Sequence, residues 1–402
     1  LIYISAPGFE YGSYQFNLAS DLLKITFPYI FLISIVAMFG GVLNTFGKFA
    51  APAFSPVFLN LSFIFAALFF NDFFDEPITV LAWAVFFGGV IQLLFQYPFI
   101  LKLGWSPQLD FNLKDDGVWK VLKLMGPAII GVSITQISLL INTIFASFLQ
   151  QGSVSWLYFA DRLMEFPAGV LGVALSTVFL PALSASFSSK NYEEFNKLMN
   201  WSTRIGLLVS IPAAIGIAVL SLPLITTLFY YGKFSELDLV MTHRALFAYS
   251  FGLIGLIMIK VFAPIFYSQK NIKTPVRIGI ITLFVTQAMN LILIPYFEHV
   301  GLALAISIGA TFNAAMLFLA IKKMNDFKIE STTFIFLMKV ILSASMMGVI
   351  LYLINPDFQY WITINFFSRL ILLLALVALG AVVFLSLLFL QGVKLKNLRN
   401  NI

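Results

Sequence analysis

The feature that most constrains this chain is a succession of long apolar stretches separated by short polar segments. A helix of about 20 mostly apolar residues suffices to cross roughly 30 Å of hydrocarbon. By that rule the sequence predicts an all-α polytopic membrane protein whose residues 1–5 end an earlier span. Its eleven complete spans are expected near 25–46, 53–71, 78–101, 120–148, 155–185, 204–230, 244–267, 275–296, 300–321, 333–354 and 366–391.

Composition supports this prediction and excludes several function classes. Of the 402 residues, 60% are hydrophobic and only 10% are charged, whereas a soluble domain carries about 25% charged residues. The absence of cysteine and the presence of only two histidines argue against a disulfide scaffold, a thiol nucleophile and a metal site. The sequence also contains neither a Walker loop nor a Ser–His–Asp arrangement. We therefore predict neither an enzyme nor a bound cofactor.

The basic residues are distributed unevenly between alternate loops. The more basic set of loops, with the adjoining helix ends, holds 17 of the 24 Lys and Arg residues. The opposite set holds only Lys24, Lys233, Arg244 and Arg369. Since cytoplasmic loops are enriched in Lys and Arg, we predict a multi-pass membrane protein with a cytoplasmic C-terminus. The net charge of +6 then reflects orientation, not nucleic-acid binding. The basic set comprises loops 47–52, 102–119, 186–203, 268–274, 322–332 and the tail after 391.

Two of these basic loops are long enough to have structure of their own. Residues 103–119 and 186–203 mix aromatic and apolar side chains with Lys, Glu and Asn. Each fits either a short amphipathic helix in the membrane interface or a solvated loop.

Segments 81–92 and 302–313 resemble each other at an offset of 221 residues. The offset covers six predicted helices, so both copies would cross the membrane in the same direction, as in transporters built from parallel repeats. The aligned small and polar residues are Ala82, Ala84, Gly88 and Gln92 with Ala303, Ala305, Gly309 and Asn313.

The duplication predicts a domain organisation of two six-helix lobes, the first incomplete, plus two C-terminal helices. Residues 1–101 form the latter half of the first lobe, 102–119 a cytoplasmic linker and 120–323 the second lobe. Residues 324–402 form the two further helices and a cytoplasmic tail. Because only three whole spans precede residue 101, we expect about two and a half helices to precede Leu1 in the natural protein.

Five ionisable residues fall inside predicted spans: Asp161, Arg162, Glu165, Lys260 and Lys339. A charge at the centre of a bilayer costs about 2.5–3.5 kcal/mol on insertion scales, so such residues normally face a cavity or a partner. The first three lie on adjacent faces of one helix at spacings of three and four. They form either a self-neutralising cluster that stabilises packing or a cavity site whose arginine binds phosphate or carboxylate with two hydrogen bonds.

Polar residues recur at helical spacing on three further spans. Each stripe alone fits interhelical hydrogen bonding, which contributes about 0.6 kcal/mol per contact in membranes. Three stripes within one predicted lobe favour a wetted surface between helices. The stripes are Ser133, Gln136, Thr143 and Ser147; Thr282, Thr286 and Asn290; and Ser307 with Thr311.

Several segments of the sequence form recognisable motifs. They are Ala6-Pro-Gly-Phe, Phe27-Pro-Tyr-Ile, Leu43-Asn-Thr-Phe-Gly-Lys-Phe, Pro56-Val-Phe-Leu-Asn-Leu, the stretch from Gly152 through Ala160-Asp-Arg-Leu to Leu175, and Lys260-Val-Phe-Ala-Pro-Ile-Phe-Tyr-Ser. These segments are similar to the MurJ (MviN) family of lipid II flippases, within the superfamily of multidrug and polysaccharide exporters. The resemblance implies fourteen helices, in two six-helix lobes and a C-terminal pair that forms a groove for a lipid tail. By that count the first two helices and most of the third lie outside this sequence.

The resemblance also implies site residues. Arg162 resembles the family's essential cavity arginine, with Asp161 and Glu165 beside it, and we add Gln136 and Lys260 as candidates for the same substrate cavity. Some members of the family bind sodium through carboxylates in the second lobe. The matching positions, our candidates for an ion site, are Asn142, Asn290 and Thr311, none of which is a carboxylate.

The function that the resemblance implies is transport of an undecaprenyl-diphosphate-linked peptidoglycan precursor, lipid II, from the inner to the outer leaflet of the bacterial cytoplasmic (inner) membrane. We expect a monomer that works by alternating access within membrane lipid, driven by membrane potential or a monovalent cation. Two alternatives remain open at this point. One is export of another polyprenyl-linked glycan or a lipophilic drug on the same fold, and the other is a non-transporting membrane scaffold.

Overall fold

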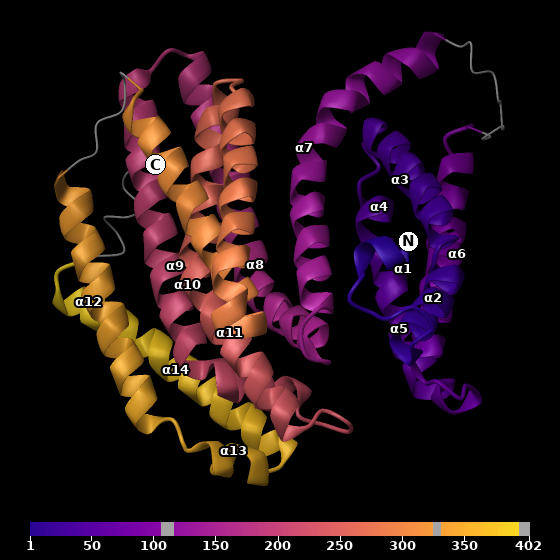
Figure 1. The fold of residues 1–402 in the computed structure, drawn as a ribbon. Coiled ribbons are helices and arrows are strands. Elements are labelled where there is room, and N and C mark those ends of the chain that lie inside the picture. The colour runs from indigo at the N-terminus through magenta and orange to yellow at the C-terminus, as the bar shows by residue number, and fades with distance from the viewer. Residues whose placement is uncertain (106–115, 325–330, 394–402) are drawn as a thin grey trace. The chain divides into compact units, whose positions relative to one another are not determined.

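A computed structural model describes residues 1–105, 116–324 and 331–393 of the chain (Figure 1). The described residues form helices joined by turns, without strands, which confirms the predicted all-α class. Nine of their helices are long and apolar enough to span a membrane, so the chain is a multi-pass membrane protein. Contacts divide the chain into two compact units, Leu1–Met125 and Gly126–Ile402.

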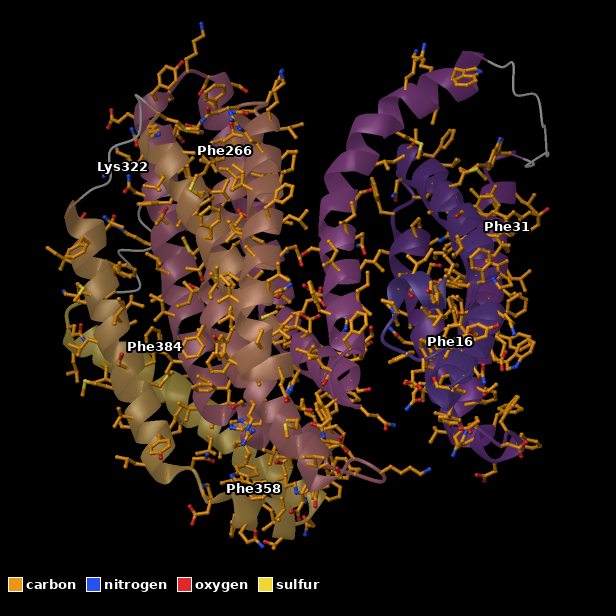
Figure 2. All side chains as sticks on the ribbon, in the orientation of Figure 1. Phe16, Phe31, Phe266, Lys322, Phe358 and Phe384 are labelled. Carbon is orange, nitrogen blue, oxygen red and sulfur yellow. The ribbon has the colours of Figure 1, made fainter. Side chains whose placement is uncertain are left out.

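The first unit holds three candidate membrane spans, Tyr14–Thr45, Ala50–Phe69 and Ile78–Leu101, two of which are each made of two consecutive helices. Its core lies where α3 and α4 meet α6, around Phe39, Leu43, Ala51 and Ile100. Most of its large apolar side chains point outward, as Phe31 illustrates with 67% of its surface exposed (Figure 2). Such exposure suits lipid contact. The elements are α1 (Ile2–Ser5), α2 (Tyr14–Thr26), α3 (Tyr29–Thr45), α4 (Ala50–Phe54), α5 (Pro56–Phe69), the 3₁₀ turn Asn71–Phe73, and α6 (Ile78–Leu101).

The second unit is a bundle built around one central helix. Helix α10 (Glu236–Ser268) packs against α8, α9 and α11 (Figure 1), and Phe266 near its end is 1% exposed (Figure 2). Small residues allow this close packing, because a Cβ on Gly255 would lie 2.6 Å from the backbone of Ala310 in α11. The other long helices are α7 (Asp116–Ser147), whose first residues belong to the first unit, α8 (Ser153–Ser188), α9 (Tyr192–Phe229) and α11 (Lys273–Lys322).

Helix α11 contains the two predicted spans 275–296 and 300–321 as an antiparallel pair. The reversal occurs at Glu298, whose φ of 50° and ψ of −127° are not helical. The two halves then lie against each other, since a Cβ on Gly301 would meet the backbone of Leu293 and one on Gly309 would meet Thr286. The 50-residue element is therefore a hairpin of two spans.

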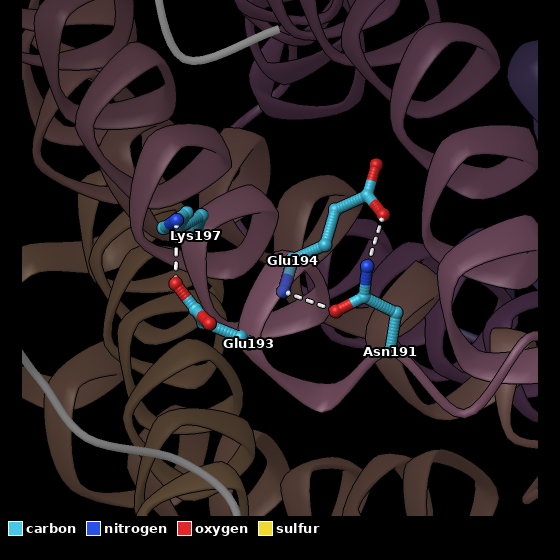
Figure 3. A network of polar contacts seen from close by, with 4 residues as sticks. All are labelled: Asn191, Glu193, Glu194 and Lys197. Carbon is cyan, nitrogen blue, oxygen red and sulfur yellow. Dashed lines mark hydrogen bonds and ion pairs between the residues drawn. The ribbon is translucent and has the colours of Figure 1, made fainter.

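One sequence-based boundary was wrong. Residues 192–203 form neither a separate interfacial helix nor a loop, because they are the first three turns of α9. Asn191 caps this helix by accepting from the Glu194 N–H at 3.2 Å and donating to its carboxylate at 2.9 Å, and Lys197 pairs with Glu193 at 2.7 Å (Figure 3). The apolar side chains of these turns pack in the same core as α8 and α10. The other long basic loop, 103–119, lies mostly outside the described residues, and α7 begins at Asp116.

Helices α12 (Ser331–Ile354) and α14 (Phe366–Leu390) are joined through the short helix α13 (Phe358–Thr363), and α12 and α14 pack against α9. The buried Arg369 guanidinium holds this junction together. From the sequence, Arg369 counts only among the less basic loops and their adjoining helix ends. It donates to carbonyl oxygens at the ends of α9 and α13, where helix dipoles favour a cation. The four acceptors are Trp361 at 2.9 Å, Ile362 at 3.0 Å, and Thr226 and Tyr230 at 3.3 Å each.

The opposite ends of α12 and α14 are joined by Lys339. Its ammonium donates to the carbonyl oxygen of Gln391, the residue that ends α14, at 2.6 Å. The Gln391 amide donates in turn to the Ser343 hydroxyl at 2.9 Å. The intramembrane Lys339 therefore stabilises the pairing of the two C-terminal helices.

Candidate substrate site

The helix that carries the candidate arginine is fixed at its first turn. Trp156 is 2% exposed, and its indole N–H donates to the Asp238 carboxylate at 2.7 Å. Asp238 also closes the capping box that begins α10 with Ser235. Gly152, with a φ of 104°, precedes the helix. Glycine is required at this position because a Cβ would collide with the Trp156 ring. The start of α8 is thereby positioned against the start of α10.

Arg162 lies two turns along α8 and is held by its own helix. Its Nη1 pairs with Glu165 Oε2 at 2.7 Å, and its guanidinium carbon lies 4.9 Å from the centre of the Tyr158 ring. The Arg162 and Glu165 side chains are 55% and 60% exposed. An exposed pair of this kind stabilises a protein by about 0–1 kcal/mol. Tyr158 and Glu165 therefore orient the guanidinium, and because the ion pair with Glu165 is exposed, the guanidinium can exchange this partner for another anion.

A shallow, largely open groove of about 700 Å³ lies along the same face of α8, and all of its lining residues belong to this helix. Arg162 and Glu165 form its polar end, and the rest of its wall is small or apolar. These residues recur at spacings of three and four, so they form one stripe of the helix. The complete lining is Arg162, Glu165, Phe166, Gly169, Val170 and Ala174. Such a groove has one cationic end and an apolar wall, which suits an amphiphile with an anionic head.

The structure separates the remaining predicted substrate residues from this groove. Asp161 is half-buried and is not part of its wall. Lys260 of α10 packs its methylene chain over Gly172, which is not part of the groove lining and lies ten residues, about 15 Å, along α8 from Arg162. Gln136 is exposed on α7 and also lies outside the wall. Of the five candidates, only Arg162 and Glu165 line the groove together.

Two of the three predicted ion-site residues do meet. The Asn290 amide donates to Asn142 Oδ1 at 2.8 Å and to Gln287 Oε1 at 2.9 Å. Asn290 is fully buried, and its own Oδ1 lacks a hydrogen-bond partner among the described residues. Thr311 is exposed, and its hydroxyl donates to the Ser307 carbonyl of its own helix at 2.9 Å. The structure thus forms an amide cluster of Asn142, Gln287 and Asn290.

Sequence reasoning missed Tyr158 and Gln287 as neighbours of the candidate residues. Tyr158 precedes Arg162 by four positions and Gln287 precedes Asn290 by three, and both spacings place side chains on one helix face. Their positions were therefore a usable signal. The contact of Asn290 with Asn142, 148 positions away, has no such local signal.

Comparisons with known proteins decide the family. The sequence matches the family model described as "Lipid II flippase MurJ" over residues 1–372. The chain belongs to this family. It is 41% identical to a probable lipid II flippase MurJ of Buchnera aphidicola over 99% of its own length and 77% of that protein. It is 42% identical to a probable lipid II flippase MurJ of Haemophilus influenzae over 95% of its length and 76% of that protein.

A solved structure supports the same assignment. The fold is similar to a lipid II flippase MurJ in an inward closed conformation, with a TM-score of 0.81 and 26% identity over 96% of this chain and 76% of that one. The predicted membership of the MurJ family is therefore confirmed. As a MurJ flippase the chain belongs to a family of membrane transporters, whose named substrate, lipid II, is a lipid-linked precursor.

Proposed function

We propose that this chain carries lipid II from the inner to the outer leaflet of the bacterial inner membrane, with Arg162 binding the diphosphate. The observation that supports the proposal most is the placement of the Arg162 guanidinium at the polar end of the apolar groove along α8. Lipid II joins an anionic diphosphate to an apolar chain, and a guanidinium binds phosphate oxygens with two parallel hydrogen bonds.

Glu165 occupies the guanidinium while no substrate is bound. Because the pair is exposed and weak, an incoming diphosphate displaces the carboxylate at little cost. Tyr158 keeps the guanidinium plane oriented through the exchange. Binding and release of the head group then require only a change of partner on one helix, without a covalent step.

The direction of transport follows from the predicted orientation. With the C-terminus in the cytoplasm, outward movement of an anionic head group across an inside-negative membrane gains about 2.3 kcal/mol per charge for each 100 mV. We propose that membrane potential drives the cycle. The amide cluster around Asn290 has three side-chain oxygens and no carboxylate, which suits a monovalent cation less well than a charged site would.

Binding of purified chain to lipid II tests the assignment. We expect lipid II to compete better than other undecaprenyl-linked glycans or lipophilic drugs. Arg162→Ala should weaken binding about tenfold or more, since a hydrogen bond to a charged group contributes about 1.5–3 kcal/mol. Arg277→Ala, at an exposed arginine near the start of α11, is the matched control. If Arg162→Ala and Arg277→Ala bound lipid II equally well, Arg162 would not be part of the binding site.

The two alternatives give different results in the same assay. A drug or glycan exporter on this fold would bind its own ligand in preference to lipid II, and a scaffold would bind none of them with dependence on Arg162. The arginine at the head of an apolar groove favours the lipid-linked diphosphate over both.

A further inference from the structure

A second cavity of about 460 Å³ lies away from the α8 groove and shares no residue with it. It is formed by the first turns of α10 and by the reversal of α11 at Glu298. These helix ends are the ones predicted to lie on the outer side of the membrane. None of the transport roles proposed above uses it. Its walls are Met241, His243, Arg244, Phe247 and residues Pro295 to Val300.

The cavity holds a cation and an anion that do not neutralise each other. Arg244 and Glu298 are both exposed and both line it. Neither takes part in an ion pair within 4.0 Å among the described residues. One ligand in this cavity could therefore place an anionic group on the Arg244 guanidinium and a cationic group on the Glu298 carboxylate.

His299 closes part of the cavity wall as a neutral group. The ring is 3% exposed, and its Nε2 lies 3.0 Å from the carbonyl oxygen of Met241. A carbonyl only accepts, so Nε2 carries the proton and Nδ1 is an acceptor. This Nδ1 is buried away from the cavity space. Arg244 and Glu298 are therefore the charged groups that a ligand in the cavity meets.

The rim of the cavity is aromatic. Phe247, Tyr296 and Phe297 line it and are 44%, 80% and 50% exposed. They stand at one end of two apolar spans, where aromatic side chains meet the interface between lipid and water. A ligand held here would contact acyl chains on one side and water on the other.

We propose that this cavity binds the headgroup of a zwitterionic aminophospholipid, a phosphoethanolamine. Its phosphate would pair with Arg244, and its primary ammonium would donate to the Glu298 carboxylate. An anionic phospholipid satisfies only Arg244. A choline lipid has no N–H to donate to Glu298. The inference does not depend on the transported substrate.

Native mass spectrometry of the purified chain tests the proposal with three lipids of equal chain length. We expect dioleoyl phosphatidylethanolamine to remain bound about tenfold more than dioleoyl phosphatidylcholine or phosphatidylglycerol, which corresponds to one or more charge-assisted hydrogen bonds. Equal retention of the ethanolamine and choline lipids by the unmodified chain would overturn the proposal.

Two variants assign the preference to this cavity. Arg244→Gln and Glu298→Gln should each reduce the ethanolamine preference to about twofold or less. Lys233→Gln and Glu236→Gln remove exposed charges of the same sign near the start of α10 but outside the cavity wall, and they should keep it. A preference that survives both cavity variants would place the lipid elsewhere and overturn the assignment. If one variant does not fold, the other and the lipid comparison on the unmodified chain still decide.

Discussion

The two hairpins that contain the internal sequence repeat pack in a similar way. In the first unit, a Cβ on Gly88 of α6 would lie 2.8 Å from Leu59 of α5. In the second, a Cβ on Gly309 would lie 2.1 Å from the Thr286 hydroxyl in the preceding half of α11. The paired small residues before each glycine are also buried, namely Ala82 and Ala84 with Ala303 and Ala305. The two hairpins therefore use small residues at corresponding repeat positions for close packing, and the parallel duplication itself stays a prediction.

The hairpins differ in what covers them. The second, α11, packs against α10, and its most apolar stretch is 39% buried, whereas the corresponding stretches of the first are 11% buried for Ala50–Phe69 and 33% for α6. Gln92, at the repeat position, is buried and donates to the Ser55 carbonyl at 3.2 Å, while its counterpart Asn313 is only half-buried. The same pattern therefore specifies a hairpin, but a third helix determines how deeply it is buried.

The largest expected effect on the second unit comes from Arg369→Met. The change leaves four carbonyl oxygens at the α9 and α13 ends without a donor, and we expect a loss of about 3 kcal/mol. Denaturation of the purified chain in detergent measures it, with Arg277→Met as the exposed control. An unchanged midpoint would show that the C-terminal helices do not depend on this junction.

Gly255→Ala should destabilise the second unit by about 2 kcal/mol. Its Cβ would lie 2.6 Å from the α11 backbone at Ala310, which cannot move without displacing the hairpin. The same denaturation experiment applies. Gly216→Ala, where a Cβ meets nothing within 4 Å, is the control and should be neutral or stabilising by up to about 1 kcal/mol.

Gly88→Ala, in the first hairpin, should cost less, about 1 kcal/mol or below. Its nearest neighbour is the flexible end of Leu59, and the closest backbone atom lies 3.3 Å away. Because this change acts on the first unit, a proteolysis assay that follows residues 1–105 measures it. A cost equal to that of Gly255→Ala would contradict the distinction between a neighbour that is a flexible side chain and one that is rigid backbone.

The smallest expected effect is the coupling between Asn142 and Asn290. A double-mutant cycle with alanine at each position should give about 0.6 kcal/mol, the usual size of an interhelical hydrogen bond in a membrane. Thr282→Ala, whose hydroxyl donates to its own helix at 2.9 Å, is the control partner and should show no coupling to Asn142. A coupling of several kcal/mol would indicate that the amide cluster binds an ion.

Local sequence pattern predicted most of the architecture because apolar length and charge asymmetry are properties of single segments. It predicted the hairpin of α11 from two apolar runs, and it predicted the neighbours Arg162 and Glu165 from their spacing of three. It did not predict the extension of α9 through residues 192–203, because their burial depends on α8 and α10. Nor did it predict the role of Arg369, whose acceptors Thr226 and Tyr230 lie 143 and 139 positions away.

Arg162 is proposed to bind the lipid-linked diphosphate while it crosses the membrane. The most direct measurement is the amount of lipid II reachable from outside in cells depleted of their own flippase and supplied with the gene that encodes this chain. We predict that the unmodified gene and the Arg277→Ala variant restore outward-facing lipid II, and that Arg162→Ala, expressed at the same level, does not. Restoration by Arg162→Ala equal to that by the unmodified gene would contradict the account.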